Sequence, residues 1–213
     1  MKSSGDDSAR IEQSADALGD AALEPFEALY RRKAPVWDIG RPQEAVVDLA
    51  RSGQIQGRVL DIGCGTGENA IFLADLGHDV LGLDIAPTAI AQARRKATER
   101  SVAASFAVAD ARDLSDLGQA FDTVIDSGVF HVFADEDRAR FVSSLATLLS
   151  SGGRCFVLAF SDDEPGTWGP RRVSAAELRE SFADGWRLDA LEPAEYVTFR
   201  GPARAWLATL TRC

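Results

Sequence analysis

The 213-residue sequence contains few of the residues that would indicate a disulfide-bonded, metal-bound or membrane protein. Its cysteines are Cys64, Cys155 and Cys213, an odd and widely spaced set that predicts neither a disulfide framework nor a zinc site and fits a reducing cytoplasm. No apolar run approaches the ~18 residues of a membrane span, and the first residues lack the apolar segment of a secretion signal. We therefore expect a cytoplasmic protein without a membrane partner.

Basic residues are outnumbered, with 23 lysines and arginines against 33 acids and a net charge of −10. Affinity for nucleic acid depends on clustered positive charge, so a nucleic-acid partner is not expected. The hydrophobic content of 46 % is enough for one buried core, and no linker divides the main body. We expect residues 1–20 to be mobile and residues 21–213 to form a single domain, in which residues 21–52 make an N-terminal helical lid.

A glycine-rich turn lies between an apolar strand pattern and an apolar helical pattern. Gly63, Gly65 and Gly67 alternate with other residues in this turn. Glycine allows the backbone to turn sharply and to come close to a bulky ligand. About 20 residues later a second apolar strand ends in Asp84, where nucleotide-binding α/β domains place a carboxylate for ribose hydroxyls. A nucleotide-like ligand is therefore predicted.

The glycine spacing and the preceding acid argue against a nicotinamide-dependent dehydrogenase, the rival enzyme class. Dinucleotide folds use G-x-G-x-x-G, whereas this turn reads G-x-G-x-G. Asp61, at the end of the first strand, would repel a pyrophosphate but suits a sulfonium or an ammonium. The two tyrosines, Tyr30 and Tyr196, lie far from any lysine suitable for hydride-transfer chemistry.

The stretch Val59–Asn69 together with Leu81–Ile85 resembles the motif pair of class I S-adenosylmethionine-dependent methyltransferases, and the likeness extends over residues 35–213. The resemblance implies S-adenosylmethionine as cofactor and S-adenosylhomocysteine as product. It further implies a set of cofactor-binding residues along the strand ends. These are Asp61, Gly63, Gly65 and Gly67 around the methionine part, Asp84 on the ribose, Ile85 against the adenine, Asp110 at the adenine amino group with Ala111 after it, and Asp126 at the end of the fourth strand, before Ser127 and Gly128, which the family places beside the methyl group.

Alternating strand and helix patterns predict an α/β fold with a doubly wound, mostly parallel sheet. The resemblance implies seven strands, of which the last is inserted antiparallel. Strands are expected near 58–62, 80–84, 104–108, 121–126, 153–160, 187–199 and 204–209, and helices near 25–32, 43–52, 68–76, 87–99, 136–149 and 174–183. Ligands of such sheets bind at the carboxyl ends of the strands, where the glycine turn lies.

His131 is the candidate general base, because it follows the methyl-facing strand end and histidine titrates near neutral pH. A half-buried residue that caps the loop is the structural alternative. The predicted acceptor pocket consists of Phe130, Phe133, Phe160 and Trp168, although a core role is as plausible for the first two.

Residues 37–43 resemble the Trp-acid-x-Gly-x-Pro stretch of the thiopurine and halide/thiol methyltransferase branch, which implies that Trp37 and Gly40 contact the cofactor. Residues 121–132 and 134–140 are similar to bacterial methyltransferases that act on heterocyclic toxins such as hydroxyquinolones. This likeness implies methyl transfer to O, N or S of a small aromatic or heterocyclic molecule, as a detoxification reaction. No carboxylate cluster predicts a metal site. A halide or thiol methyltransferase and a non-catalytic cofactor-binding protein remain as alternatives, and the sequence leaves the oligomeric state open.

Overall fold

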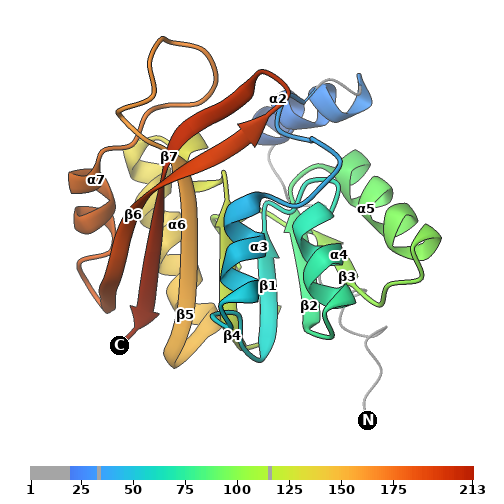
Figure 1. Ribbon diagram of the computed structural model, residues 1–213, viewed down its shortest axis with the longest axis horizontal. Coiled ribbons are helices and arrows are strands. Elements are labelled where there is room, and N and C mark those ends of the chain that lie inside the picture. The colour runs from blue at the N-terminus through green and yellow to red at the C-terminus, as the bar shows by residue number, and fades with distance from the viewer. Residues whose placement is uncertain (1–19, 33–34, 115–116) are drawn as a thin grey trace.

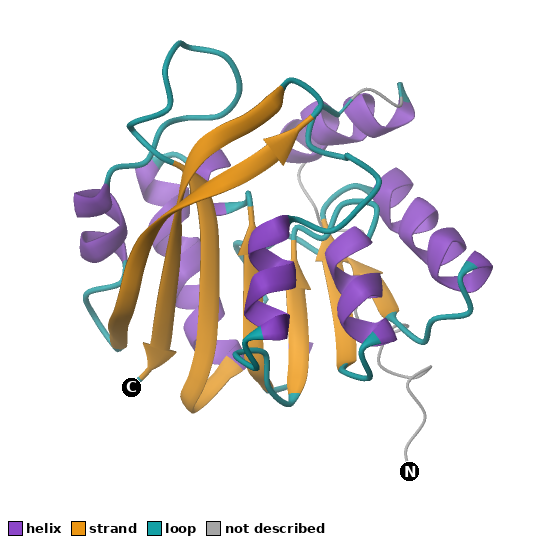
Figure 2. Cartoon of the chain, in the orientation of Figure 1, coloured by secondary structure: helices purple, strands orange, loops and turns teal. Residues whose placement is uncertain are grey.

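A seven-stranded sheet forms the centre of the fold, with helices on both of its faces (Figures 1 and 2). The computed structural model describes residues 20–32, 35–114 and 117–213. The strands are β1 (Arg58–Ile62), β2 (Asp79–Asp84), β3 (Ser105–Val108), β4 (Phe121–Ser127), β5 (Leu149–Phe160), β6 (Trp186–Thr198) and β7 (Gly201–Arg212). Their order across the sheet is β3-β2-β1-β4-β5-β7-β6. The predicted mobile segment lies outside the described residues, except for Asp20.

The pairing of the strands confirms the predicted doubly wound sheet. Strands β3, β2, β1, β4 and β5 run parallel, and β7 is antiparallel to both of its neighbours, β5 and β6. Ile62 lies between Leu83 of β2 and Asp126 of β4, so the carboxyl ends of the three central strands meet at one edge. The sequence motifs identified above therefore come together there.

Among the described residues, six helices and the short 3₁₀ turn η2 lie before β1 and between the strands. They are α2 (Asp20–Arg31), α3 (Glu44–Arg51), α4 (Glu68–Asp75), α5 (Pro87–Glu99), η2 (Phe130–Val132), α6 (Asp135–Leu148) and α7 (Ala175–Ser181). Helix α2 begins at Asp20, upstream of the start expected near residue 25, so that Pro25 lies inside the helix. Strand β5 begins at Leu149, directly after α6 and earlier than the expected residue 153. Among the described residues no helix is both long and apolar enough to cross a bilayer.

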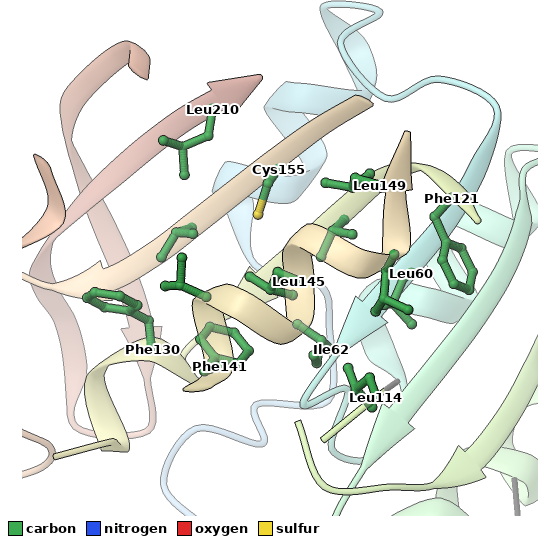
Figure 3. Close-up of a cluster of buried hydrophobic side chains, with 14 of the residues drawn as sticks. Leu60, Ile62, Leu114, Phe121, Phe130, Phe141, Leu145, Leu149, Cys155 and Leu210 are labelled. Carbon is green, nitrogen blue, oxygen red and sulfur yellow. The ribbon is translucent and has the colours of Figure 1, made fainter. Parts of the chain in front are cut away.

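The core lies on both faces of the sheet because successive side chains of a strand point in opposite directions. Leu60 and Ile62 of β1 pack with Leu145 of α6, as Figure 3 shows, whereas Val59 packs on the other face with Ile71 of α4. By this alternation Asp61 falls on the same face as Val59. A carboxylate therefore occupies an interior strand position at the edge where the strands end.

Candidate functional site

A cavity of about 470 Å³ lies at the carboxyl ends of the parallel strands. Ile62, Asp84 and Ser127, which end the three central strands, form one wall of it. A smaller cavity of about 50 Å³ lies along the glycine turn. The two cavities share five lining residues, which we call the neck: Tyr30, Trp37, Gly63, Ser127 and Tyr196. The arrangement suits a ligand with a larger and a smaller part.

The glycine turn adopts a backbone conformation that other residues rarely occupy. Gly63, Gly65 and Gly67 have φ values of +66°, +54° and +86°. A Cβ on Gly63 would lie 2.0 Å from Cγ2 of Val129. Gly63 and Gly65 line the smaller cavity, whereas Gly67 begins α4 and, like Gly40, lines neither cavity. The first two glycines thus form the floor that the sequence predicts for a closely approaching ligand.

Asp61 is a buried carboxylate with no side-chain partner among the described residues, and neither of its oxygens accepts a hydrogen bond of normal geometry from them. Burial raises its pKa to about 8, the charges of Asp84 and Asp126 add to this shift, and the backbone amide of Ala70 only partly opposes it. Neither cavity is lined by Asp61 itself. A buried, unpaired carboxylate is costly, and a cationic ligand at the adjoining glycine turn would offset that cost. The site therefore fits the charge of S-adenosylmethionine.

Asp84 is held in place by two backbone amides and faces the large cavity. One oxygen accepts from the N–H of Gly65 at 2.8 Å and the other from that of Ala86 at 2.9 Å. Burial raises its pKa to about 6, and these hydrogen bonds partly oppose the shift. Each carboxylate oxygen retains capacity for a further donor, as a pair of ribose hydroxyls would require. Ile85 lines the same cavity.

Asp110 and Ala111 also line the large cavity, where Asp110 already has a partner in Arg112. The Arg112 side chain contacts Asp110 at 2.5 Å and reaches Asp137 at 3.2 Å. Burial opposes the ionisation of Asp110, but the hydrogen bonds from Arg112 outweigh it and lower its pKa. Arg112 was not among the predicted site residues, and its place two residues after Asp110 is the only sequence signal for it.

Asp126 lies behind the cavity wall instead of within it, and its direct contact with the cofactor stays a prediction. Its oxygens accept from the N–H of Val129 at 2.7 Å and of Phe130 at 2.9 Å, and it lines neither cavity. Burial raises its pKa to about 7. These two hydrogen bonds hold the turn after β4 and thereby position Ser127. The buried Oγ of Ser127 has no hydrogen-bond partner among the described residues.

His131 lines the large cavity, where its hydrogen bonding favours a role as donor over the predicted role as general base. Its Nδ1 accepts from the backbone N–H of Phe160 at 3.0 Å. A neutral imidazole carries one proton, so that proton lies on Nε2, which is then a donor and not a proton acceptor. Burial lowers the pKa of His131 to about 3, with smaller contributions from Arg172 and Arg138. Protonation at neutral pH is therefore unfavourable.

Three of the four aromatic residues predicted for the acceptor pocket line the large cavity, namely Phe133, Phe160 and Trp168. Phe130 does not, because η2 directs it into the core, where its ring stacks on Phe182 at 5.7 Å. Tyr196 was not among the predicted site residues; its distance from any suitable lysine only argued against a dehydrogenase. The structure places it in the neck, with its hydroxyl donating to the carbonyl of Ser127 at 3.3 Å.

Residues of α2, together with Val36 and Trp37, line one side of the large cavity. Figure 1 shows α2 at the end of the sheet toward which the parallel strands point. Glu27 of α2 accepts from the N–H of Thr88 at 3.1 Å and from its hydroxyl, at the first turn of α5. The Trp37 indole donates to the hydroxyl of Tyr30 at 3.0 Å. Ala86 is the N-cap residue of α5 and has no side chain that could accept a hydrogen bond. Glu27, on another helix, therefore provides the cap of α5. Helix α2 is thus attached to the first turn of α5, close to Asp84.

Comparisons with known proteins agree with this geometry. Residues 59–153 match the family model described as a methyltransferase domain. Over 179 residues the sequence is 38 % identical to the 2-heptyl-1-hydroxyquinolin-4(1H)-one methyltransferase of Mycobacteroides abscessus, covering 79 % of each chain.

Solved structures share the fold as well. One, from work on the conversion of a disulfide bond into a thioacetal group during echinomycin biosynthesis, is 39 % identical with a TM-score of 0.82, covering 89 % of this chain and 92 % of that one. Another is the 1,6-didemethyltoxoflavin-N1-methyltransferase of Burkholderia thailandensis with its acceptor and S-adenosylhomocysteine bound, at 21 % identity and a TM-score of 0.72, covering 89 % of this chain and 86 % of that one. The chain therefore belongs to the S-adenosylmethionine-dependent small-molecule methyltransferases.

Proposed function

We propose that the chain methylates the oxygen, nitrogen or sulfur of an aromatic heterocycle of the hydroxyquinolone kind, and that this reaction detoxifies the acceptor in the cytoplasm. The observation that carries the proposal is the aromatic wall that Phe133, Phe160 and Trp168 contribute to the large cavity. Flat apolar molecules are bound by such walls, with a few polar groups setting their orientation. The 38 % identity to a hydroxyquinolone methyltransferase supports the same acceptor class.

The two cavities suggest how the cofactor would be held. Asp84 and Ile85 would contact the adenosine in the large cavity, and Gly65 would approach the methionine part in the smaller one. When bound, the cofactor supplies a methyl group activated by the positive sulfur. Methyl transfer is an in-line displacement, so the main tasks of the protein are to align the acceptor and to exclude water. Tyr196 and Trp37 of the neck would surround the transfer position.

The test combines calorimetric titrations with a product assay. We expect S-adenosylmethionine and S-adenosylhomocysteine to bind and NAD, the control, not to bind. Mass spectrometry should then detect the gain of one methyl group on 2-heptyl-1-hydroxyquinolin-4(1H)-one. Cofactor binding without methylation of any heterocycle or thiol would favour the non-catalytic alternative.

Methylation of a thiol is the second candidate. It is favoured by the 39 % identity to a protein solved in connection with chemistry at a disulfide. Rates with thiophenol, phenol and iodide as acceptors would separate the alternatives. A preference for iodide would contradict the proposed aromatic acceptor, because the wall of Phe160 and Trp168 is far larger than a halide ion needs.

Replacing Glu27 with alanine should weaken S-adenosylmethionine binding about tenfold, because the first turn of α5 loses its cap and α2 loses its attachment beside Asp84. Calorimetry measures the affinity, and hydrogen exchange measures the protection of α2. The matched control is Glu24→Ala, because Glu24 is exposed on the same helix. Equal affinities for the two variants would show that the Glu27 contact does not support the site.

A further inference from the structure

The charges around the cavity are divided between its two ends. Asp61, Asp84 and Asp126 lie at the ends of β1, β2 and β4, on the side of the glycine turn. Asp110 and Asp137 also line the large cavity and are held by Arg112. We call the lining residues from the end of β4 and the turn after it, from β5 and the loop after it, and from β6 the acceptor side. No carboxylate is found among these described residues, which are Ser127, Gly128, Val129, His131, Val132, Phe133, Phe160, Trp168, Gly169, Pro170, Tyr196 and Thr198.

Arg172 supplies a positive charge beside this acceptor side. Its guanidinium lies 5.3 Å from the ring centre of Phe160 and 6.0 Å from that of Trp168. Its hydrogen bonds go to backbone carbonyls, including Pro170 at 2.7 Å and Glu164 at 3.2 Å. Carbonyl groups hold the guanidinium in place without cancelling its charge. The positive field of Arg172 therefore extends to the two rings that line the cavity.

His131 adds a neutral hydrogen-bond donor to the same side. Because Nδ1 accepts from Phe160, the proton on Nε2 is held toward the turn at Gly128, where a Cβ would lie 3.3 Å from Nε2. The imidazole packs edge-on against Phe160 at 5.2 Å and near Tyr196 at 5.9 Å. Such a donor stabilises an anionic oxygen or sulfur and cannot remove a proton from a neutral one.

The other charged groups near His131 do not reverse this pattern. Arg138 of α6 approaches from behind Phe130 and is paired with Glu177 at 3.3 Å. In the loop after β5, Glu164 accepts from the backbone N–H of Arg204 at 2.7 Å, while Asp162 accepts from the indole of Trp206 and Asp163 is exposed. Asp61 and Asp126 lie beyond Tyr196 on the cofactor side, where they raise its pKa.

Building on the proposed function, we propose that the acceptor loses its proton in solution and is bound as the resulting anion. The enzyme thus selects ionised acceptors instead of deprotonating neutral ones. The anionic oxygen or sulfur uses a lone pair to form the bond to the methyl carbon, while the carbon–sulfur bond of the sulfonium breaks and its electron pair passes to sulfur. A cation and an anion become two neutral products, so no proton has to be removed during the transfer.

The first test uses 4-nitrophenol, whose absorbance reports its ionisation, bound to the wild-type protein with S-adenosylhomocysteine so that no turnover occurs. We expect bound nitrophenol to titrate at least about one pH unit below the free compound. 4-Nitroanisole, which cannot ionise, should bind at least about tenfold more weakly. Titration at or above the solution value, or no binding of nitrophenol at any pH, would overturn the proposal.

Variants identify the groups responsible. Arg172→Gln should weaken nitrophenolate binding about tenfold and leave nitroanisole binding unchanged, whereas Arg171→Gln, at the exposed neighbour paired with Asp135, should change neither. His131→Gln keeps both an acceptor for Phe160 and a donor toward the cavity, so it should retain activity that His131→Leu loses. Full loss in His131→Gln, with cofactor binding intact, would instead indicate a base.

Kinetics separate this proposal from the proposed function. For a series of substituted phenols, kcat/KM should rise with pH up to the pKa of each acceptor, so that the inflection follows the acceptor. One inflection shared by all acceptors, and abolished in His131→Gln, would refute anion selection while the methyltransferase activity itself still stood. Absence of any methylated product would reject the proposed function instead, and the nitrophenol titration would still decide how the site treats anions.

Discussion

Replacing Asp61 with asparagine is expected to weaken S-adenosylmethionine binding about a hundredfold at pH 9, the largest effect of any single side chain in the site. The buried carboxylate has no side-chain partner among the described residues. An amide of the same shape removes its charge and replaces one acceptor oxygen by a donor NH2 group. Loss of one member of a buried charge pair costs about 3 kcal/mol or more, which corresponds to this factor. S-adenosylhomocysteine, which lacks the sulfonium charge, should be affected less.

The same substitution should stabilise the cofactor-free protein. Asp61 has a pKa of about 8 in the folded state, against ~3.9 in an unfolded chain. Between these two pH values the folded state therefore keeps a proton on Asp61 that the unfolded chain has lost. The free energy of unfolding consequently falls as the pH rises from about 4 to about 8, and then levels off. Asp84 and Asp126, with pKa values of about 6 and 7, add losses of the same sign at lower pH.

Melting curves at pH 5 and pH 9 test this expectation. The Asn variant should melt above the wild type at pH 9 and close to it at pH 5, whereas Asp75→Asn, at an exposed acid that ends α4, should match the wild type at both. Wild-type affinity for S-adenosylmethionine should increase over the same pH range, because binding releases the Asp61 proton. A variant with unchanged affinity would exclude Asp61 as the counter-charge of the cofactor.

Gly63→Ala should destabilise the protein by about 3 kcal/mol or more, because two costs combine. The positive φ costs an L-residue ~1–2 kcal/mol, and the new Cβ would lie 2.0 Å from Val129, an overpacking worth ~1–3 kcal/mol. Because Val129 follows the neck residue Ser127 in the turn after β4, its displacement should also reduce cofactor binding.

Gly53→Ala is the matched control for this substitution. Gly53 has a φ of +70°, close to that of Gly63, but a Cβ there would have no atom within 4 Å. It should therefore show the backbone cost alone, about 1 kcal/mol in urea denaturation, with normal cofactor affinity. Equal destabilisation by both variants would mean that Val129 moves aside at no cost, and that the turn after β4 is not tightly packed.

The parallel sheet could be predicted because apolar strand and helix patterns alternate along the sequence, and the glycine turn marks where strands end. That prediction places Asp84, Ile85, Asp110 and Ala111 at one edge, and all four line the large cavity. The roles of these residues toward the cofactor stay predictions. The observed ends of helices and strands differ from the predicted ones where pairing between distant segments decides them. At Leu149, for example, pairing with Phe121 extends β5 back to the end of α6.

Side-chain direction within short turns could not be predicted. The sequence places Asp126, Phe130 and His131 within six positions of each other, but only His131 faces the large cavity. Asp126 closes the turn, Phe130 enters the core, and the backbone N–H of Phe160 fixes the imidazole from another strand. Tyr30 and Tyr196 reach the neck through tertiary contacts between segments more than 160 positions apart, for which no local pattern exists.

The position of β7 between β5 and β6 has a consequence for how the molecule is made. On a ribosome β6 emerges before β7, yet among the described strands β7 is the only one that β6 pairs with. The parallel half of the sheet can form while synthesis continues, whereas β6 waits for the strand that follows it. Tyr196 and Thr198 lie on β6, so the acceptor side of the cavity is completed after the cofactor side. A nascent chain stalled before Gly201 would have a glycine turn beside an acceptor side that still lacks its β6 wall.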